Sequence, residues 1–112
     1  MKIGIAGYTG RVGQLLVQEL QSNRWPDMDI AIGSSRNEPA SDPGFAVTQD
    51  PAALFSKSDA VIDFTTPSLT RDHALLASEY KTALIVGTTG LGNEEERILS
   101  EAGQSTRIVY AP

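Results

Sequence analysis

The 112-residue sequence contains no cysteine. Disulfide bonds, thiolate metal ligands and a cysteine nucleophile are therefore excluded, and we expect a cytoplasmic protein. The sequence also lacks any run of about 20 apolar residues, so we expect no membrane-spanning helix. Only Lys2 precedes the first apolar run, and no small-residue cleavage site follows it, so we expect no signal peptide.

Positive charge is scarce as well, with nine Lys and Arg residues against 14 Asp and Glu residues. The cations form no cluster, so we expect neither nucleic acid nor an anionic membrane as a partner. A polyanionic ligand would need backbone N–H groups and placed arginines, for which Arg11 and Arg36 stand beside predicted turns. We find no grouping of metal ligands and no Ser/His/Asp arrangement, and we therefore assign no metal site and no catalytic residue.

The first thirteen residues predict a buried strand, a glycine-spaced turn and a helix. A short apolar strand over residues 3–6 is followed by Gly7, Gly10 and Gly13 in a G-x-x-G-x-x-G pattern. At these positions a dinucleotide-binding unit needs a sharp turn, close approach to a pyrophosphate and close helix packing, respectively. The middle glycine is displaced by one residue from the commoner G-x-G-x-x-G, so a structural turn without a ligand is the alternative. The position between strand and helix favours a dinucleotide.

Strands and helices alternate along the rest of the chain. We expect strands over 3–6, 28–33, 45–48, 60–64, 83–86 and 108–110, helices over 10–21 and 51–56, a third helix capped by Ser68 and a fourth capped by Asn93. Most strands are continuously apolar, which indicates a parallel sheet covered on both faces. The prediction is one α/β domain over residues 1–112, a Rossmann-like doubly wound sheet with strand order 3-2-1-4-5-6.

The expected first helix carries its apolar residues on one side. Val12, Leu15, Leu16 and Leu20 share a helical face, with polar residues opposite. We therefore expect these four side chains to pack on the sheet.

Four turns are expected to meet at the carboxyl edge of the sheet, where ligands of open α/β sheets bind. They span residues 7–10, 33–36, 64–67 and 87–90, and small and hydroxyl residues dominate all of them. Such turns let the backbone approach a flat, phosphate-bearing ligand. The alternative is that Gly and Thr serve only to make the turns.

The turn after the second strand bears on the choice of cofactor, because an acid there binds a ribose 2′-hydroxyl and an arginine a 2′-phosphate. Asp27 and Asp29 lie at the amino end of that strand, away from the site. Ser35 and Arg36 lie at its carboxyl end, which favours NADPH, whereas Glu38 keeps NADH possible. An exposed loop arginine without a ligand is the alternative.

Two titratable residues stand out. His73 is the only histidine, and its place on an apolar helical face predicts a packed or capping residue rather than a catalytic one. Asp63 ends an apolar strand, where a buried carboxylate needs partners. It would either orient the 7–10 turn through backbone N–H groups or reach solvent.

Three segments together resemble one family: Ile-Ala-Gly-Tyr-Thr-Gly-Arg-Val-Gly at 5–13, Val-Ile-Asp-Phe-Thr-Thr-Pro at 61–67 and Val-Gly-Thr-Thr-Gly at 86–90. They are similar to 4-hydroxy-tetrahydrodipicolinate reductase (dihydrodipicolinate reductase) of bacterial lysine and diaminopimelate biosynthesis. The resemblance spans the chain but only the amino-terminal nucleotide domain of the family. It implies an NADPH-dependent oxidoreductase that reduces 4-hydroxy-tetrahydrodipicolinate to tetrahydrodipicolinate.

The resemblance also implies roles for single residues. The glycine turn would hold the pyrophosphate, and Ser35 and Arg36 would hold the adenosine ribose and its phosphate. The turns at 64–67 and 87–90, the two threonine turns, would border the nicotinamide ribose and ring. Some relatives carry Glu where this chain has Ser35, which weakens the expectation of NADH binding. The expected cofactor-binding residues are Gly7, Tyr8, Thr9, Gly10, Arg11, Val12, Gly13, Ser34, Ser35, Arg36, Phe64, Thr65, Thr66, Gly87, Thr88, Thr89 and Ala111.

The substrate domain of the family has no counterpart here, including its paired histidines, its lysine and its Ser-Gly-Thr stretch. We therefore expect a fragment of a longer reductase that is inactive alone, takes its cyclic dicarboxylate only with the missing domain, and forms a homo-oligomer, a tetramer in the family, at full length. Two alternatives are a stand-alone NADP-binding module for redox sensing or interaction, and the front half of another two-domain dehydrogenase resembling aspartate or homoserine dehydrogenase.

Overall fold

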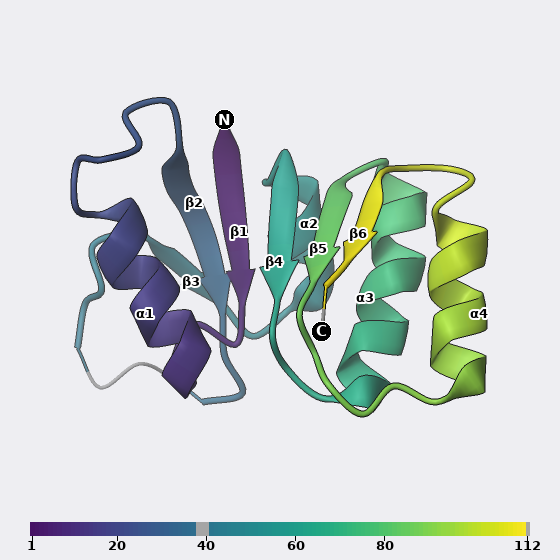
Figure 1. Cartoon of the computed structure of the whole chain (residues 1–112). Coiled ribbons are helices and arrows are strands. Elements are labelled where there is room, and N and C mark those ends of the chain that lie inside the picture. The colour runs from purple at the N-terminus through teal and green to yellow at the C-terminus, as the bar shows by residue number, and fades with distance from the viewer. Residues whose placement is uncertain (38–40, 112) are drawn as a thin grey trace.

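Six parallel strands form the centre of the computed structural model, which describes residues 1–37 and 41–111 (Figure 1). In chain order the elements are β1 (Lys2–Ala6), α1 (Arg11–Leu20), β2 (Asp29–Ser34), β3 (Ala46–Thr48), α2 (Pro51–Ser56), β4 (Ala60–Asp63), α3 (Pro67–Tyr80), β5 (Ala83–Val86), α4 (Asn93–Ala102) and β6 (Ile108–Tyr110). The strand order is β3-β2-β1-β4-β5-β6, which confirms the predicted doubly wound sheet. The order reverses between β1 and β4.

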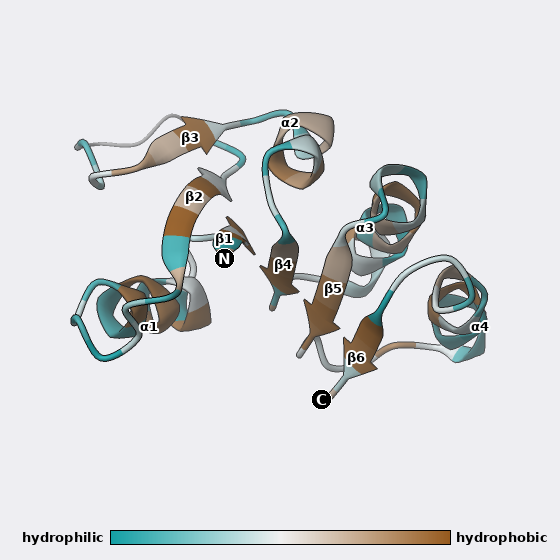
Figure 2. Ribbon diagram, turned by 90° about the horizontal axis from the view of Figure 1, so that it is seen from above, coloured by the Kyte–Doolittle hydropathy of each residue, from teal (hydrophilic) through white to brown (hydrophobic). Residues whose placement is uncertain are grey.

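Helices cover the two faces of the sheet unequally. Figure 2 shows α1 on one face and α2, α3 and α4 on the other. Between the three helices and the sheet lies the larger core, which includes Leu54, Phe55, Val61 and Leu84, all fully buried. A smaller core under α1 contains Ile3, Ile5, Tyr8, Val17 and Ala60.

Helices lie on both faces as predicted, but the face under α1 is left open toward the β6 edge (Figure 2). Helix α1 lies over β1 and its neighbours and does not reach the β6 edge (Figure 2). Ile85 and Val109 are paired in register on that face and are 36% and 54% exposed. Leu84 and Val86 point to the other face and are fully buried under α3 and α4. Buried and exposed side chains therefore alternate along β5, although its continuous apolar sequence suggested burial of all of them.

Register brings the carboxyl ends of the strands to one level. Ala6 of β1 pairs with Ser34 of β2 on one side and with Asp63 of β4 on the other. Asp63 pairs in turn with Val86, and Val86 with Tyr110. The turns that follow these strands therefore start side by side, which confirms the predicted meeting of the turns at one edge.

The apolar face expected for α1 is partly wrong. Val12 and Leu15 are 37% and 60% exposed. A Cβ at Gly13 would lie within 2.8 Å of the Tyr8 backbone, so the helix rests on the chain at this glycine and its rotation is fixed there. The side toward the sheet consequently carries Gly13, Leu16, Val17 and Leu20, at the i, i+3, i+4, i+7 spacing of one helical face.

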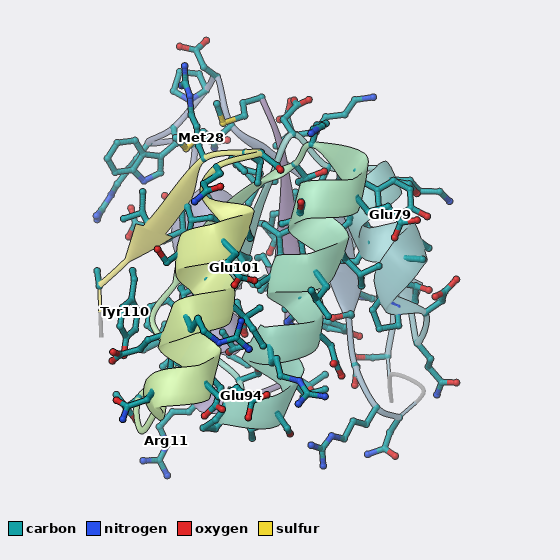
Figure 3. The ribbon with its side chains drawn as sticks, turned by 90° about the vertical axis from the view of Figure 1, so that its right-hand side faces the viewer. Arg11, Met28, Glu79, Glu94, Glu101 and Tyr110 are labelled. Atoms are coloured by element: carbon teal, nitrogen blue, oxygen red, sulfur yellow. The ribbon has the colours of Figure 1, made fainter. Side chains whose placement is uncertain are left out.

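Two expected helix caps shift by one or two residues. Helix α3 begins at Pro67 with Thr66 as its N-cap, rather than at Ser68, because proline suits the first helical position. Helix α4 is capped by Gly92, and Asn93 is its first residue. The Glu95 carboxylate accepts the Gly92 N–H at 2.9 Å and satisfies the donor there. Figure 3 shows α3 and α4 side by side, with Glu79 of α3 and Glu94 and Glu101 of α4 on the outer surface.

Candidate functional site

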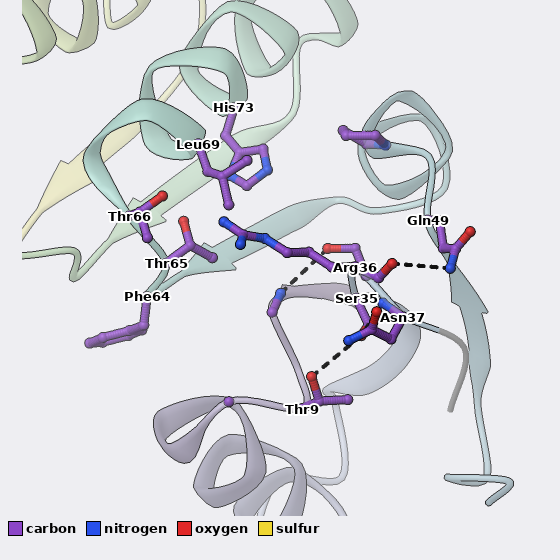
Figure 4. Close-up of a pocket in the computed structure, with 14 residues that line it drawn as sticks. Thr9, Ser35, Arg36, Asn37, Gln49, Phe64, Thr65, Thr66, Leu69 and His73 are labelled. Atoms are coloured by element: carbon purple, nitrogen blue, oxygen red, sulfur yellow. Dashed lines mark hydrogen bonds between the residues drawn. The ribbon is translucent and has the colours of Figure 1, made fainter. Parts of the chain in front are cut away.

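A cavity of about 430 Å³ opens at the carboxyl edge of the sheet, where the strand order reverses (Figure 4). It lies between the turns after β1, β2 and β4 and the first turns of α2 and α3. Its lining consists of Gly7, Thr9, Gly10, Ser34, Ser35, Arg36, Asn37, Gln49, Pro51, Phe64, Thr65, Thr66, Leu69 and His73. Nine of these residues are among the expected cofactor-binding residues, so the structure brings three of the four predicted turns together.

The glycine turn after β1 is held by the neighbouring strand. Gly7 has φ +70°, a conformation that favours glycine. The N–H groups of Gly7 and Tyr8 both donate to the Ser34 carbonyl, at 3.0 and 3.1 Å, and Gly10 donates to the Gly7 carbonyl at 3.0 Å. These three donors stabilise the turn itself. Donors that are free to bind a ligand must therefore come from the residues that follow.

Helix α1 offers such donors at its start. Gln14 is the first residue whose N–H returns to the cap, bonding the Gly10 carbonyl at 2.9 Å, so the N–H groups of residues 11–13 precede the helical ladder. Gly10 supplies no side-chain cap, and the first turn carries no acid. Helix α4, in contrast, has three glutamates in its first turn. The positive end of the α1 dipole is thus left for an anion.

The Tyr8 side chain points away from the cavity. It is 3% exposed, and its ring meets Phe45 edge-on with centroids 5.3 Å apart. Burial raises the pKa of the phenol, and its hydroxyl has no hydrogen-bond partner among the described residues. The Tyr8 and Phe45 rings pack against Gly33, where a Cβ would lie only 2.7 and 2.8 Å from them, so this packing requires a glycine. Tyr8 therefore serves the core, and only its backbone belongs to the turn.

The turn after β2 forms the opposite wall of the cavity. Thr9 Oγ1 and Ser35 Oγ lie 3.4 Å apart, which joins this turn to the glycine turn. Gln49 Nε2 donates to the Arg36 carbonyl at 3.1 Å. Figure 4 shows the Arg36 side chain extending across the cavity toward the turn after β4. Glu38, which kept NADH possible, lies outside the described residues.

The turns after β4 and β5 pack on each other through a glycine. The Phe64 ring lies over Gly87, and a Cβ at that position would overlap the ring. Phe64 is nevertheless 40% exposed and lines the cavity. Gly87 donates its N–H to the Asp63 carbonyl at 2.8 Å. The turn after β5 therefore packs against the turn after β4 and does not itself line the cavity.

Asp63 is fully buried and pairs with His73, so neither expectation for the carboxylate holds. His73 Nδ1 lies 3.1 Å from Asp63 Oδ2, and Thr65 donates its hydroxyl to Oδ1. Burial alone would raise the pKa of Asp63, but hydrogen bonding and charge from His73, with the Thr65 hydrogen bond, lower the pKa below its ordinary value. An ionised carboxylate can only accept, so a hydrogen bond at this contact requires the proton on His73 Nδ1. His73 is 3% exposed and lies beside Phe55, which confirms the predicted packed role.

The remaining expected residues do not line the cavity. Arg11 and Val12 are exposed on the first turn of α1, and Figure 3 shows Arg11 extending away from the protein body. Thr89 and Ala111 are exposed farther along the edge, and Ala111 donates its N–H to the Val86 carbonyl at 2.8 Å. The others are Tyr8, Gly13, Gly87 and Thr88, all of them buried.

Five lining residues were missed in the sequence: Asn37, Gln49, Pro51, Leu69 and His73. Gln49 and Pro51 follow the edge strand β3, so the carboxyl end of that strand was a fifth turn to consider. Leu69 and His73 lie one helical turn apart on α3 directly after a predicted ligand turn. In the described ranges 1–37 and 41–111, no three His, Asp or Glu side chains gather as metal ligands. No helix there is long and apolar enough to cross a membrane.

Comparison with known families identifies similar sequences. The family model described as dihydrodipicolinate reductase, N-terminus, matches residues 1–112. The 4-hydroxy-tetrahydrodipicolinate reductase of Ralstonia pickettii is 36% identical over 125 residues, covering 100% of this chain and 46% of the relative. That of Granulibacter bethesdensis is 40% identical over 113 residues, covering 100% and 42%. The chain thus spans less than half the length of these relatives.

Solved structures agree in fold. A dipicolinate-bound dihydrodipicolinate reductase from Paenisporosarcina sp. TG-14 superimposes with a TM-score of 0.83 at 23% identity, over 100% of this chain and 47% of that chain. A homoserine dehydrogenase from S. aureus gives a TM-score of 0.84 at 17% identity, over 99% and 32%. At such identities the likeness shows the shared fold alone.

Proposed function

Because the chain belongs to the dihydrodipicolinate reductase family and matches its N-terminal part, we propose that it is the nicotinamide-dinucleotide-binding part of an oxidoreductase. The reaction proposed for the whole protein is reduction of 4-hydroxy-tetrahydrodipicolinate to tetrahydrodipicolinate. One structural observation supports the proposal most strongly. The start of α1, with neither a side-chain cap nor an acid in its first turn, adjoins the cavity that also receives Arg36.

The glycine turn suits a pyrophosphate. The N–H groups of residues 11–13 would donate to its oxygens at the positive end of the helix dipole. Gly10 lines the cavity with no side chain to keep the ligand away. A ligand held in this way is bound mainly by backbone, so the net negative charge of the chain does not prevent it.

The turn after β2 suits the adenosine half. Ser34 and Ser35 offer hydroxyls to the ribose, and the Arg36 guanidinium would pair with a 2′-phosphate and stack on adenine. Asp29 begins β2 beside Lys2, at the far end of the strand from the cavity. We therefore propose NADPH as the preferred cofactor, with NADH as the weaker one.

The turn after β4 would border the nicotinamide end through Phe64, Thr65 and Thr66. When bound there, the cofactor supplies a hydride, and the protein must hold the acceptor against it. The groups that bind a cyclic dicarboxylate would then belong to the further length found in the relatives. The place in lysine and diaminopimelate biosynthesis, a cytoplasmic location and a homo-oligomer are proposed for that whole protein on the same family relationship.

Neither alternative gains support from the comparisons. Homoserine dehydrogenase shares the fold at 17% identity, whereas the sequence relatives at 35–40% identity carry the reductase name. A stand-alone NADP-binding module is not favoured either, because the relatives at 36% and 40% identity are named as reductases.

Replacing Arg36 with alanine is expected to weaken NADPH binding by about 10- to 100-fold, chiefly through loss of the charge-assisted contact with the 2′-phosphate. NADH loses only the stacking on adenine, so its binding should weaken by no more than about threefold. Calorimetric titration of wild-type and variant chains with both cofactors measures the difference. Arg107→Ala, at the opposite edge of the sheet, removes the same charge and serves as the control. Equal losses for both cofactors would contradict the 2′-phosphate role, and no binding of either to the wild-type chain would contradict the proposed function.

A further inference from the structure

A buried polar cluster lies behind the cavity, where an α/β core is otherwise apolar. Asp63 ends β4, Thr70 and His73 come from α3, and Thr88 comes from the turn after β5, all at most 3% exposed. Half-buried Thr65 joins the cluster to the cavity that it lines. Figure 4 shows Thr65 and His73 on the same side of the cavity. Buried polar groups are costly unless they are hydrogen-bonded, so the partners of each group indicate what the cluster holds in place.

The Thr88 hydroxyl uses its full hydrogen-bonding capacity. It accepts the Thr65 N–H at 2.9 Å and the Thr70 hydroxyl at 2.8 Å. Its own proton faces Asp63, with the carbonyl at 3.4 Å and the carboxylate at 3.5 Å. A hydroxyl has one donor and two acceptor sites, and all three are directed at partners here. The side chain of Thr88 therefore points inward and ties the turn after β5 to the turn after β4.

The Asp63 carboxylate also holds the turn after β4, through a different atom of Thr65. Its Oδ1 accepts the Thr65 hydroxyl at 2.5 Å, and its Oδ2 faces His73 Nδ1 at 3.1 Å. Thr65 is consequently fixed at two atoms, its N–H by Thr88 and its hydroxyl by Asp63. Neither Thr88 nor Asp63 lines the cavity, whereas Thr65 does.

We propose that Thr88 and Asp63 are positioning residues that act through Thr65 to set the nicotinamide end of the cofactor site. The inference rests on the proposed function, because it assigns a task to the site described there. The cluster does not extend to the adenosine end of the site. There Ser35 and Arg36 form hydrogen bonds with residues outside the cluster. A loss of the cluster would therefore affect one half of the cofactor and spare the other.

Thr88→Val tests the inference, because it keeps the shape of the side chain and removes the hydroxyl. The probes are NADPH and adenosine 2′,5′-bisphosphate, which carries the adenosine half with its 2′-phosphate and no nicotinamide. We expect NADPH binding to weaken about tenfold, as for loss of a buried hydrogen bond, and bisphosphate binding to stay within about twofold. Thr88→Ser, which restores the hydroxyl, should return NADPH affinity to within about threefold of wild type.

Thr82→Val is the matched control. Thr82 is as buried as Thr88, but its hydroxyl donates to the Phe55 carbonyl at 2.9 Å, and the residue neither belongs to the cluster nor lines the cavity. Its NADPH affinity should stay within about twofold of wild type. Titrations are run where thermal melting shows each variant folded, and Thr88→Ala replaces Thr88→Val if the latter does not fold. Parallel loss of both ligands, or no loss of NADPH, would overturn the inference, whereas a wild-type chain that binds neither ligand would overturn the proposed function itself.

Discussion

Gly13→Ala is expected to lower the free energy of unfolding by about 2–3 kcal/mol. Helix propensity alone predicts the opposite sign, since alanine in a helix interior is better than glycine by about 1 kcal/mol. The new Cβ would lie 2.7 and 2.8 Å from the Tyr8 backbone and closer still to the Gly7 carbonyl oxygen. Backbone atoms in a hydrogen-bonded turn cannot rotate away, so α1 must lift from the sheet.

Urea or thermal unfolding measures this effect, and Gly103→Ala provides the control. Gly103 follows α4 with φ −62° and ψ −14°, and a Cβ there would come no closer than 3.4 Å to its neighbours. The control should be as stable as wild type or slightly more stable. A Gly13→Ala chain with unchanged stability would show that the helix does not rest on the turn at this glycine.

Gly10→Val is expected to weaken binding of NADPH and NADH by more than about 100-fold, with little loss of stability. Gly10 has φ −72° and ψ 174°, which any residue adopts, and its Cβ would lie 3.3 Å from the Gly7 carbonyl oxygen. The backbone angles therefore admit valine, and the Gly7 carbonyl must yield by a few tenths of an ångström. The side chain would, however, extend into the cavity beside the N–H groups of residues 11–13 and exclude a pyrophosphate from them.

Gly92→Val is matched to this substitution, because Gly92 caps α4 with nearly the same backbone angles, φ −87° and ψ −178°. Gly92 does not line the cavity, so this variant should bind both cofactors as wild type does. Calorimetric titration and thermal melting of both variants separate binding from folding. Retained affinity in Gly10→Val, or equal loss in Gly92→Val, would remove the glycine turn from the site.

The sheet and the meeting of the turns were predictable, because local sequence determines both. Short apolar runs separated by helical patterns indicate parallel strands, and the carboxyl ends of parallel strands lie at one edge. The glycine spacing after β1 likewise marked two positions, Gly7 and Gly10, that line the cavity. NADPH binding at this edge stays a prediction.

The directions of side chains were harder to predict. Leu15 fits an apolar helical face by its spacing, but contact of Gly13 with the turn rotates it into solvent. Thr88 and Thr65 have the same side chain in similar turns, yet Thr88 points inward and Thr65 lines the cavity. The Asp63–His73 contact forms because α3 packs beside the end of β4. The ten-residue separation in the sequence does not by itself predict that the two side chains meet.

The most direct test of a dinucleotide site at the carboxyl edge is to titrate the isotope-labelled chain with NADPH and follow its backbone amide resonances. We expect the largest shifts at residues 11–13, at Ser35 and Arg36, and at Thr65. Residues 103–107, which line a hollow at the opposite edge of the sheet, should not respond. Shifts confined to that opposite edge, or no shifts at saturating NADPH, would contradict the assignment of this cavity as the cofactor site.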